Sequence, residues 1–289
     1  MGKLSFYKLQ ASGNDFILLD FSKSRAKKSK SFYANLAKKY CPRRYGIGAD
    51  GLLVIEPSRK ALFKMRIFNS DGSEAEMCGN GARCVGLWAR AVNKTKLKTG
   101  IIDFDTVAGI IKAKASACKK IKNEYCAAVK IKVTSPYGYK LDLPLQVLGR
   151  KIKVNFVNTG VPHVVVFVEG LSKIDVREIG QAIRFHKKFG TAGANVNFVE
   201  VIGKNRIALR TYERGVEDET LACGTGSIAS SIVYQLKFES SNPQKNIAIF
   251  AKTKSSEGLK VSFDITKDKI DNVWLQGQAF LVYKGEIVL

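Results

Sequence analysis

Two stretches of the sequence, half the chain apart, carry the same pattern of residues. Residues 74–81 read Glu-Ala-Glu-Met-Cys-Gly-Asn-Gly, and residues 219–226 read Glu-Thr-Leu-Ala-Cys-Gly-Thr-Gly. Both fit ExxxCGxG, with Cys78 in the first copy and Cys223 in the second. Two identical spacings of four defining positions in one chain suggest an internal repeat.

Other segments repeat in the same order and at nearly the same offset. They pair residues 12–16 with 159–163, 48–50 with 193–195, and 65–66 with 209–210. The order predicts two copies of one α+β unit, because unrelated matches would not keep a nearly constant offset. We place the division at 1–137 and 138–289, and leave open whether the final strand, near 277–289, packs back on the first unit.

Each cysteine is expected at the start of a helix. Apolar residues after the first motif stand at 82, 85, 88, 89 and 92, and after the second at 228, 232, 233 and 236. This spacing is typical of a helix, and strand-like sequence precedes each motif. The glycines of the motif permit positive φ and close approach of a ligand to the backbone.

A thiol at a helix N-terminus is suited to proton transfer. Unpaired N–H groups and the helix dipole favour the thiolate there, and can lower a cysteine pKa from about 8.5 to about 3.5–7.5. The same N–H groups would hold a carboxylate. Inversion of a stereocentre needs a base on one face and an acid on the other. The alternative, that Cys78 and Cys223 are only small buried side chains, does not explain why each repeats with its glutamate and glycines.

Composition limits the other classes of function. The 289 residues include 48 Lys and Arg against 25 Asp and Glu, a formal charge of +23. Such a charge invites a nucleic-acid interpretation, but the basic segments lack interleaved aromatic residues, so we expect basic surface and no nucleic-acid partner.

No apolar run reaches the roughly 20 residues of a membrane span. The start lacks a signal peptide, which predicts a cytoplasmic protein. The six cysteines contain no CxxC pair, which argues against structural zinc.

Beyond these patterns, the chain resembles the diaminopimelate epimerase family. The matching stretches cover residues 12 to 227 in family order, and the two cysteine segments are the most specific of them. The stretches are SGNDFILLD, RRYGIGADGLLVIE, FNSDGSEAEMCGNGARC, NTGVPH, ANVNF and YERGVEDETLACGTG. The resemblance implies two similar domains, each a strand-rich barrel around a central helix, with the active site in the cleft between them.

The resemblance also implies an activity and a set of site residues. It implies interconversion of LL- and meso-diaminopimelate in lysine and peptidoglycan precursor biosynthesis, without a cofactor or metal, with Cys78 and Cys223 as the two bases. The partner would be a small amino acid, and a homodimer is compatible with the sequence. The residues expected to bind substrate are Asn14, Asn69, Gly79, Asn80, Asn195, Glu213, Arg214, Gly224 and Thr225.

Some alternatives stay open at this point. Relatives of this fold act on proline, hydroxyproline or histidine, so a related racemase is the second hypothesis. Gly46–Gly51 fits GxGxxG, but it precedes a strand and opens no helix, so nucleotide binding is rejected. His163 is either a helper of a nearby thiol or a structural histidine. Glu74 and Glu219 are expected to accept hydrogen bonds from turn N–H groups before each cysteine.

Overall fold

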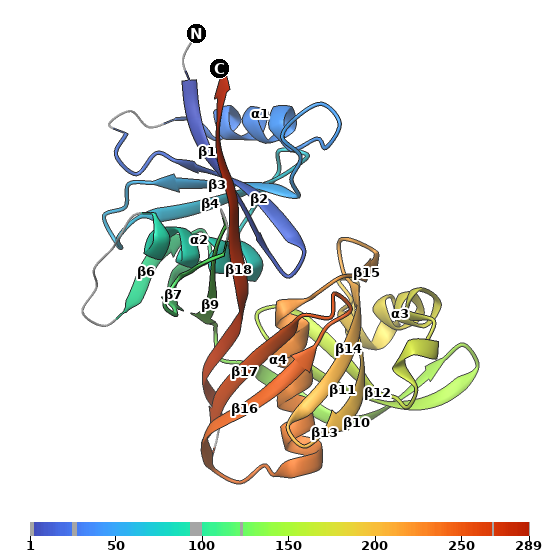
Figure 1. Cartoon of the computed structure of the whole chain (residues 1–289). Helices are drawn as coiled ribbons and strands as arrows, with labels where there is room; N and C mark the ends of the chain where they lie inside the picture. The colour runs from blue at the N-terminus through green and yellow to red at the C-terminus, as the bar shows by residue number, and fades with distance from the viewer. Residues whose placement is uncertain (1–2, 25–27, 93–99, 122–123, 268, 289) are drawn as a thin grey trace. The chain divides into compact units, whose positions relative to one another are not determined.

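The structure is a computed structural model, and it describes residues 3–24, 28–92, 100–121, 124–267 and 269–288. It divides into two compact units. Unit 1 contains Met1–Ile131 and Gly277–Leu289, and unit 2 contains Lys132–Gln276. Each unit therefore contains one of the two cysteine motifs. The chain mixes many strands with few helices, which confirms the predicted α+β class (Figure 1).

Unit 1 is built mainly from the first half of the chain. Its first hairpin and first helix lead into the strands that precede Cys78, and further hairpins follow the second helix. The elements are β1 (Lys3–Ala11), β2 (Asn14–Asp20), α1 (Lys30–Tyr40), β3 (Gly51–Glu56), β4 (Lys64–Asn69), β5 (Glu74–Ala75), α2 (Gly79–Ala91), β6 (Ile101–Thr106), β7 (Gly109–Ala115), β8 (Lys119–Ile121) and β9 (Glu124–Lys132).

Unit 2 repeats this order around Cys223. Its elements are β10 (Tyr137–Val147), β11 (Arg150–Asn158), β12 (Pro162–Phe167), α3 (Val176–Arg184), β13 (Asn195–Gly203), β14 (Arg206–Glu213), β15 (Asp218–Thr220), α4 (Gly224–Tyr234), β16 (Gln244–Lys252), β17 (Gly258–Ile265) and β18 (Ile270–Val288). Short 3-10 turns at Leu171–Lys173 and Lys187–Phe189 flank α3, and a π-helical turn at Gln235–Glu239 extends α4. The last strand, β18, begins in unit 2 and ends in unit 1.

The strand pairing shows the same plan in both units. In unit 1, β2 pairs in parallel with β3, β3 pairs antiparallel with β4, and β4 pairs antiparallel with β5. In unit 2, β12, β13, β14 and β15 pair in the same senses. A helix makes each parallel crossover, α1 between β2 and β3 and α3 between β12 and β13, because parallel neighbours need a long connection.

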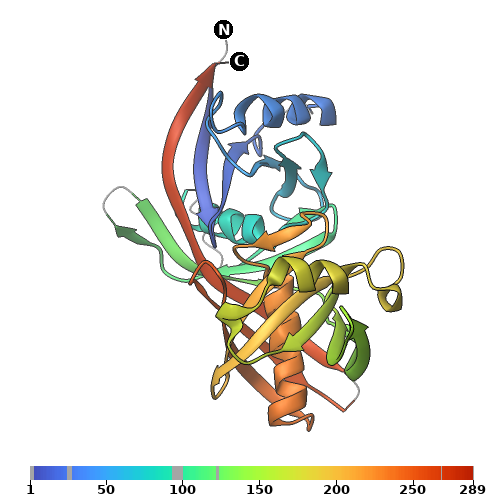
Figure 2. The ribbon, with the colours of Figure 1, turned by 90° about the vertical axis from the view of Figure 1, so that its right-hand side faces the viewer.

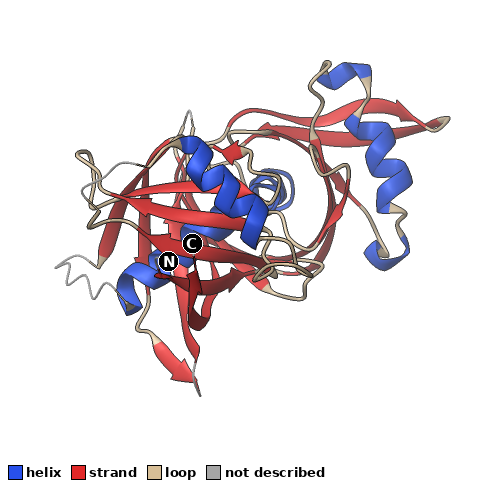
Figure 3. Ribbon diagram, turned by 90° about the horizontal axis from the view of Figure 1, so that it is seen from above, coloured by secondary structure: helices blue, strands red, loops and turns tan. Residues whose placement is uncertain are grey.

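The two crossover helices lie outside the strands, whereas α2 and α4 lie inside. α1 contacts β3 and β4, and α3 contacts β10, β13, β14 and β15. In Figure 2, α3 lies in front of the unit 2 strands and α4 stands behind them. α4 contacts β11, β12, β13, β14, β16 and β17, and Figure 3 shows it end-on within a ring of strands. The central helix is therefore the core of its unit.

Burial on all sides explains the composition of these central helices. In α2 every residue from Asn80 to Ala89 is buried, and in α4 every residue from Gly226 to Tyr234. Small residues let strands approach: a Cβ on Gly86 would lie 2.8 Å from Cγ1 of Val129. A helix enclosed by strands needs no polar face. None of the helices in the described part of the chain is long and apolar enough to cross a membrane.

Candidate active site

Cys78 occupies the N-cap of α2. Its backbone is extended, with φ −139° and ψ 124°, and its carbonyl accepts a hydrogen bond from the N–H of Ala82 at 2.8 Å. The side chain is half-buried. Because the first N–H groups of a helix have no partner in the preceding turn, those of Gly79 and Asn80 are available near the thiol. The helix position expected for Cys78 is confirmed.

Cys223 occupies the matching N-cap of α4, again with extended backbone. Its Sγ accepts a hydrogen bond from the N–H of Gly226 at 3.4 Å and lies 3.5 Å from Oγ1 of Thr225. Its carbonyl accepts from both the N–H and the hydroxyl of Ser227. Cys223 as a residue is 5% exposed. A backbone donor and the helix dipole together stabilise negative charge on this sulfur.

The glycines of the motif are required by packing. A Cβ on Gly226 would lie 2.3 Å from Oδ1 of Asn197, one on Gly224 would lie 2.8 Å from Leu275, and one on Gly81 would lie 3.0 Å from Leu53. The positive φ that a glycine permits is not used here, since none of these glycines is among the described glycines with positive φ. Their missing side chains bring neighbouring groups close to each thiol.

The glutamate of each motif is held by an arginine, and the prediction of turn capping is wrong. Glu74 accepts two hydrogen bonds from Arg66, and Glu219 accepts two from Arg210. Burial by itself would raise the pKa of Glu219, but hydrogen bonds from Arg210 and Lys254 outweigh it and lower the pKa. These pairs join the strands β4 to β5 and β14 to β15, directly before the cysteines.

A buried cluster joins the first hairpin of unit 1 to the start of α2. The guanidinium of Arg83 is fully buried and donates to Oδ1 of Asn80 and to Oγ of Ser12. Asn80 therefore uses its side-chain oxygen inside the protein, whereas its backbone N–H is suited to the predicted role. Asn14 follows in the same turn, and its buried Oδ1 has no hydrogen-bond partner among the described residues.

A second cluster, which the sequence analysis missed, fixes the position of that turn. Arg43 donates to both carboxylate oxygens of Asp15 and to Asp50, and Lys8 also donates to Asp15 at 2.7 Å. Burial would raise the pKa of Asp15, but the hydrogen bonds from Arg43 and Lys8 hold it well below its usual range. Asp50, the acid of the GIGADG segment, therefore shares Arg43 with Asp15 and links this segment to the hairpin beside Asn14.

Asn69 ends β4, as Glu213 ends β14. The side chain of Asn69 is exposed, and its Nδ2 donates to Oγ of Ser73 at 2.9 Å. Glu213 is partly buried, and burial raises its pKa. A ligand ammonium group would stabilise the charged form of this carboxylate.

Asn195 and Arg214 are brought together at the end of two paired strands. Asn195 is 5% exposed as a residue, and its Oδ1 accepts a hydrogen bond from the backbone N–H of Arg214 at 2.8 Å. The Asn195 oxygen therefore positions the Glu213–Arg214 corner, and its amide nitrogen is the group suited to a ligand. His163 pairs with Asn195 in the parallel β12–β13 register and is fully buried.

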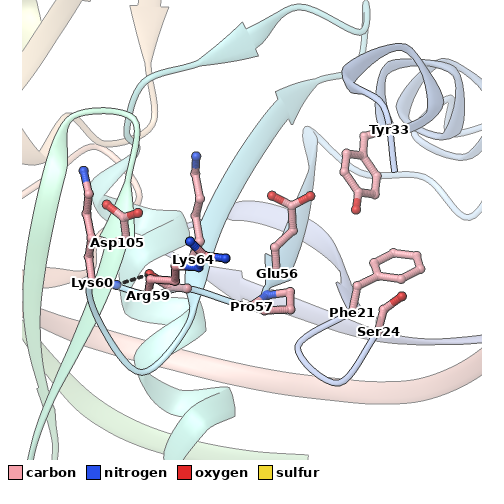
Figure 4. Close-up of a pocket in the computed structure, with 10 residues that line it drawn as sticks. Phe21, Ser24, Tyr33, Glu56, Pro57, Arg59, Lys60, Lys64 and Asp105 are labelled. Atoms are coloured by element: carbon pink, nitrogen blue, oxygen red, sulfur yellow. Dashed lines mark hydrogen bonds between the residues drawn. The ribbon is translucent and has the colours of Figure 1, made fainter. Parts of the chain in front are cut away.

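The cavity drawn in Figure 4 lies elsewhere in unit 1. It has a volume of about 660 Å³, and its lining includes Tyr33, Glu56, Lys60, Lys64 and Asp105 but none of the predicted site residues. In the described part of the chain, no three His, Cys, Asp or Glu side chains are grouped so that they could hold a metal ion.

Comparison with known proteins identifies the family. The model of the family described as "Diaminopimelate epimerase" matches residues 6–130 and 155–253. A diaminopimelate epimerase of Aquifex aeolicus is 40% identical, with 98% of each chain covered. One from a Hydrogenobaculum species is 39% identical, with 96% of each covered.

Solved structures share the fold at low sequence identity. A PhzF-family phenazine biosynthesis protein of Bacillus anthracis has a TM-score of 0.74 and 16% identity, with all of both chains covered. A probable proline racemase of Agrobacterium radiobacter has a TM-score of 0.68 and 13% identity, over 99% of this chain and 93% of that one. The fold alone is thus shared with proteins of several names, whereas the sequence matches over nearly its whole length place this chain in the diaminopimelate epimerase family.

Proposed function

We propose that this protein interconverts LL- and meso-diaminopimelate without a cofactor, using Cys78 and Cys223 as acid and base. The observation that carries the proposal is that both cysteines occupy the N-cap position of a buried central helix, in duplicated motifs. Membership of the family supports the substrate. The proposal extends to a cytoplasmic location, where amino-acid precursors are made.

In the proposed reaction one cysteine starts as thiolate and removes the α-proton of the substrate. The electron pair left on carbon delocalises into the adjacent carboxylate, which gains negative charge. The other cysteine, as thiol, then gives its proton to the opposite face of the same carbon, and the configuration is inverted. The reverse reaction exchanges the two roles, so both thiols must reach one carbon during turnover.

The helix starts supply the electrostatic part of catalysis. Backbone N–H groups of Gly79, Asn80, Gly224 and Thr225 would hold the reacting carboxylate and stabilise the charge that develops on it. Loss of one such donor typically costs about 10²–10³ in kcat. In unit 2, a further N–H group of the same helix start, that of Gly226, donates a hydrogen bond to Sγ of Cys223.

The remaining predicted residues would bind the two ends of the substrate. Glu213 is suited to an ammonium group. Burial raises the pKa of its carboxyl group, and a positive charge beside it would stabilise the ionised form. Arg214 supplies a guanidinium for a carboxylate. The amides of Asn14, Asn69 and Asn195 would bind the distal amino-acid group and its neighbours. Specificity for a substrate with two amino-acid ends follows from these two sets of groups.

Deuterium exchange tests the proposal directly. The protein is incubated in heavy water with LL-diaminopimelate, and α-deuteration and meso product are followed by mass spectrometry and chiral chromatography. We expect both in the wild type and no meso product from Cys78→Ser or Cys223→Ser. By the proposed mechanism, α-deuteration of LL-diaminopimelate should be lost in the variant that lacks the base for this isomer, whereas the other variant can still exchange the proton with retention. Cys118→Ser is the matched control, because Cys118 is also half-buried but belongs to neither motif. Full activity of either motif variant would contradict the two-base proposal.

The same assay separates substrates. Proline, hydroxyproline and histidine are offered in parallel, because structural neighbours include a probable proline racemase and a hydroxyproline epimerase. Exchange on one of these and none on diaminopimelate would retain the chemistry and overturn the substrate.

A further inference from the structure

His163 is a fully buried histidine whose two ring nitrogens have different surroundings. Nδ1 lies 3.1 Å from Nδ2 of Asn197, also fully buried, whereas Nε2 is buried without a hydrogen-bond partner among the described residues. A buried donor or acceptor left unsatisfied costs about 1–3 kcal/mol. Such an atom in a native fold calls for an explanation.

The contacts of Asn197 determine which nitrogen carries the proton. Its Nδ2 lies 3.0 Å from the carbonyl oxygen of Val164, which can only accept, and its Oδ1 accepts from the hydroxyl of Thr211 at 3.0 Å. The amide therefore cannot be flipped, and the second hydrogen of Nδ2 points to Nδ1 of His163. Nδ1 must be the acceptor, so a neutral imidazole carries its proton on Nε2.

The ring is kept neutral by its surroundings. Burial, and then the positive charge of Arg214, lower the pKa of His163 to about 3. Protonation of Nδ1 would also set it against the amide donor of Asn197. The group that remains is an uncharged Nε2–H donor within the electrostatic influence of Arg214.

The other end of Asn197 lies against the cysteine motif. The position that a Cβ would take on Gly226 is 2.3 Å from Oδ1 of Asn197. The N–H of the same glycine donates to Sγ of Cys223. Asn197 therefore packs directly against Gly226, the residue whose N–H donates to the sulfur. A movement of the Asn197 side chain would change the space available to the turn at Gly226.

We propose that Asn197 is a positioning residue that fixes His163 as the neutral Nε2–H tautomer and supports the Gly226 turn that donates to Cys223. The Nε2–H is then the group left to donate to an anionic part of a bound substrate. The predicted effect on turnover rests on the proposed function. The tautomer of His163 and the support of the Gly226 turn can be tested without any enzyme activity.

The first test is the tautomer itself, read by nitrogen NMR on protein labelled with ¹⁵N-histidine. The chain has only two histidines, and His186→Gln assigns the signals. We expect His163 to show an acceptor-type Nδ1 and a protonated Nε2, unchanged between about pH 5 and 8. In the wild-type protein, a protonated Nδ1, or titration near the ordinary pKa of about 6.5, would by itself overturn the proposal.

The second test changes the donor. In Asn197→Asp the carboxylate can only accept, so His163 should switch to the Nδ1–H tautomer or the imidazolium. The matched control is Asn155→Asp. Asn155 is 2% exposed, its amide likewise donates to a strand carbonyl, that of Val165, and its oxygen accepts from Asp142. A switch in the control, or none in Asn197→Asp, would contradict the assignment.

The third test follows the sulfur. The rate of alkylation of Cys223 by iodoacetamide, measured by peptide mapping, should change several-fold in Asn197→Ala, whereas that of Cys78 should not. We expect kcat for diaminopimelate to fall about 10- to 100-fold in Asn197→Asp, the range found for groups that orient metal-binding side chains through a hydrogen bond. An altered tautomer with unchanged alkylation and turnover would overturn the positioning role; absence of epimerase activity in the wild type would instead overturn the proposed function.

Discussion

Arg210 and Glu219 are joined by two hydrogen bonds, 2.7 Å from Nε to Oε1 and 2.9 Å from Nη2 to Oε2. Arg66 and Glu74 make the same two-pronged pair in unit 1, at 2.6 and 3.1 Å. Each glutamate also contacts a lysine, Lys254 or Lys30. The duplicated motif thus includes a fixed ion pair four residues before each cysteine, and this pair sets the turn that leads into the central helix.

Loss of one of these carboxylates should destabilise its unit. Glu219→Gln leaves the partly buried guanidinium of Arg210 without its charged partner, so we expect a loss on the order of 2 kcal/mol in the free energy of unfolding. Urea denaturation checks this, with Glu169→Gln as the exposed control. Because the pKa of Glu219 is lowered in the native state, the difference between wild type and variant should shrink as the pH falls below about 4.3.

Glu213 should show the opposite relation between stability and pH. The pKa of Glu213 is raised in the native state, so just above the ordinary glutamate pKa the native protein binds more protons than the unfolded chain. The free energy of unfolding of the wild type therefore falls as the pH rises through that window. Glu213→Gln removes this titration. We expect the variant to be at least as stable as the wild type at pH 7 and to lose most turnover. A less stable, fully active variant would place Glu213 outside the site.

Arg214 should matter for binding more than for folding. We expect Arg214→Ala to raise KM for diaminopimelate at least tenfold, because loss of a charged hydrogen bond costs about 1.5–3 kcal/mol. Arg150→Ala, at an exposed position of the same unit, is the control. Steady-state kinetics and thermal melting of both variants separate binding from stability. Equal KM values would show that the substrate carboxylate is bound elsewhere.

Acid should destabilise the native state through His163. The unfolded chain binds a proton on this histidine below about pH 6.5, whereas the native pKa is about 3. Stability from this group is therefore complete above pH 6.5 and is lost as the pH falls towards 3, by up to about 1.4 kcal/mol per pH unit. Urea midpoints between about pH 4 and 6.5 should fall less steeply in His163→Gln. Parallel slopes would contradict a buried neutral histidine.

The helices after the cysteines were predictable because their pattern is local. Apolar residues at helical spacing and a preceding polar turn predict where a helix starts, whatever the surroundings, and α2 and α4 begin directly after Cys78 and Cys223. The repeat was visible because duplication preserves order along the chain. Both kinds of information lie in the spacing of residues and need no knowledge of contacts.

The partners of the polar side chains were not predictable in the same way. Glu219 follows Arg210 by nine positions, and only the antiparallel β14–β15 pairing brings the two together. Sequence reasoning gave this glutamate a backbone partner in its own turn, the nearest option along the chain. The Asp15–Arg43–Asp50 cluster was missed for the same reason, since its members come from different segments.

The sequence by itself determined the duplicated α+β plan, the cysteine at each helix start and the family of the chain. The tertiary structure decided how the polar groups behind those cysteines are used. His163, Asn197 and Gly226 carry no shared motif, and their relation depends on strand register, which places an amide between an imidazole and a helix turn. Periodicity is a property of neighbours along the chain, whereas a tautomer depends on which donors folding places against the ring.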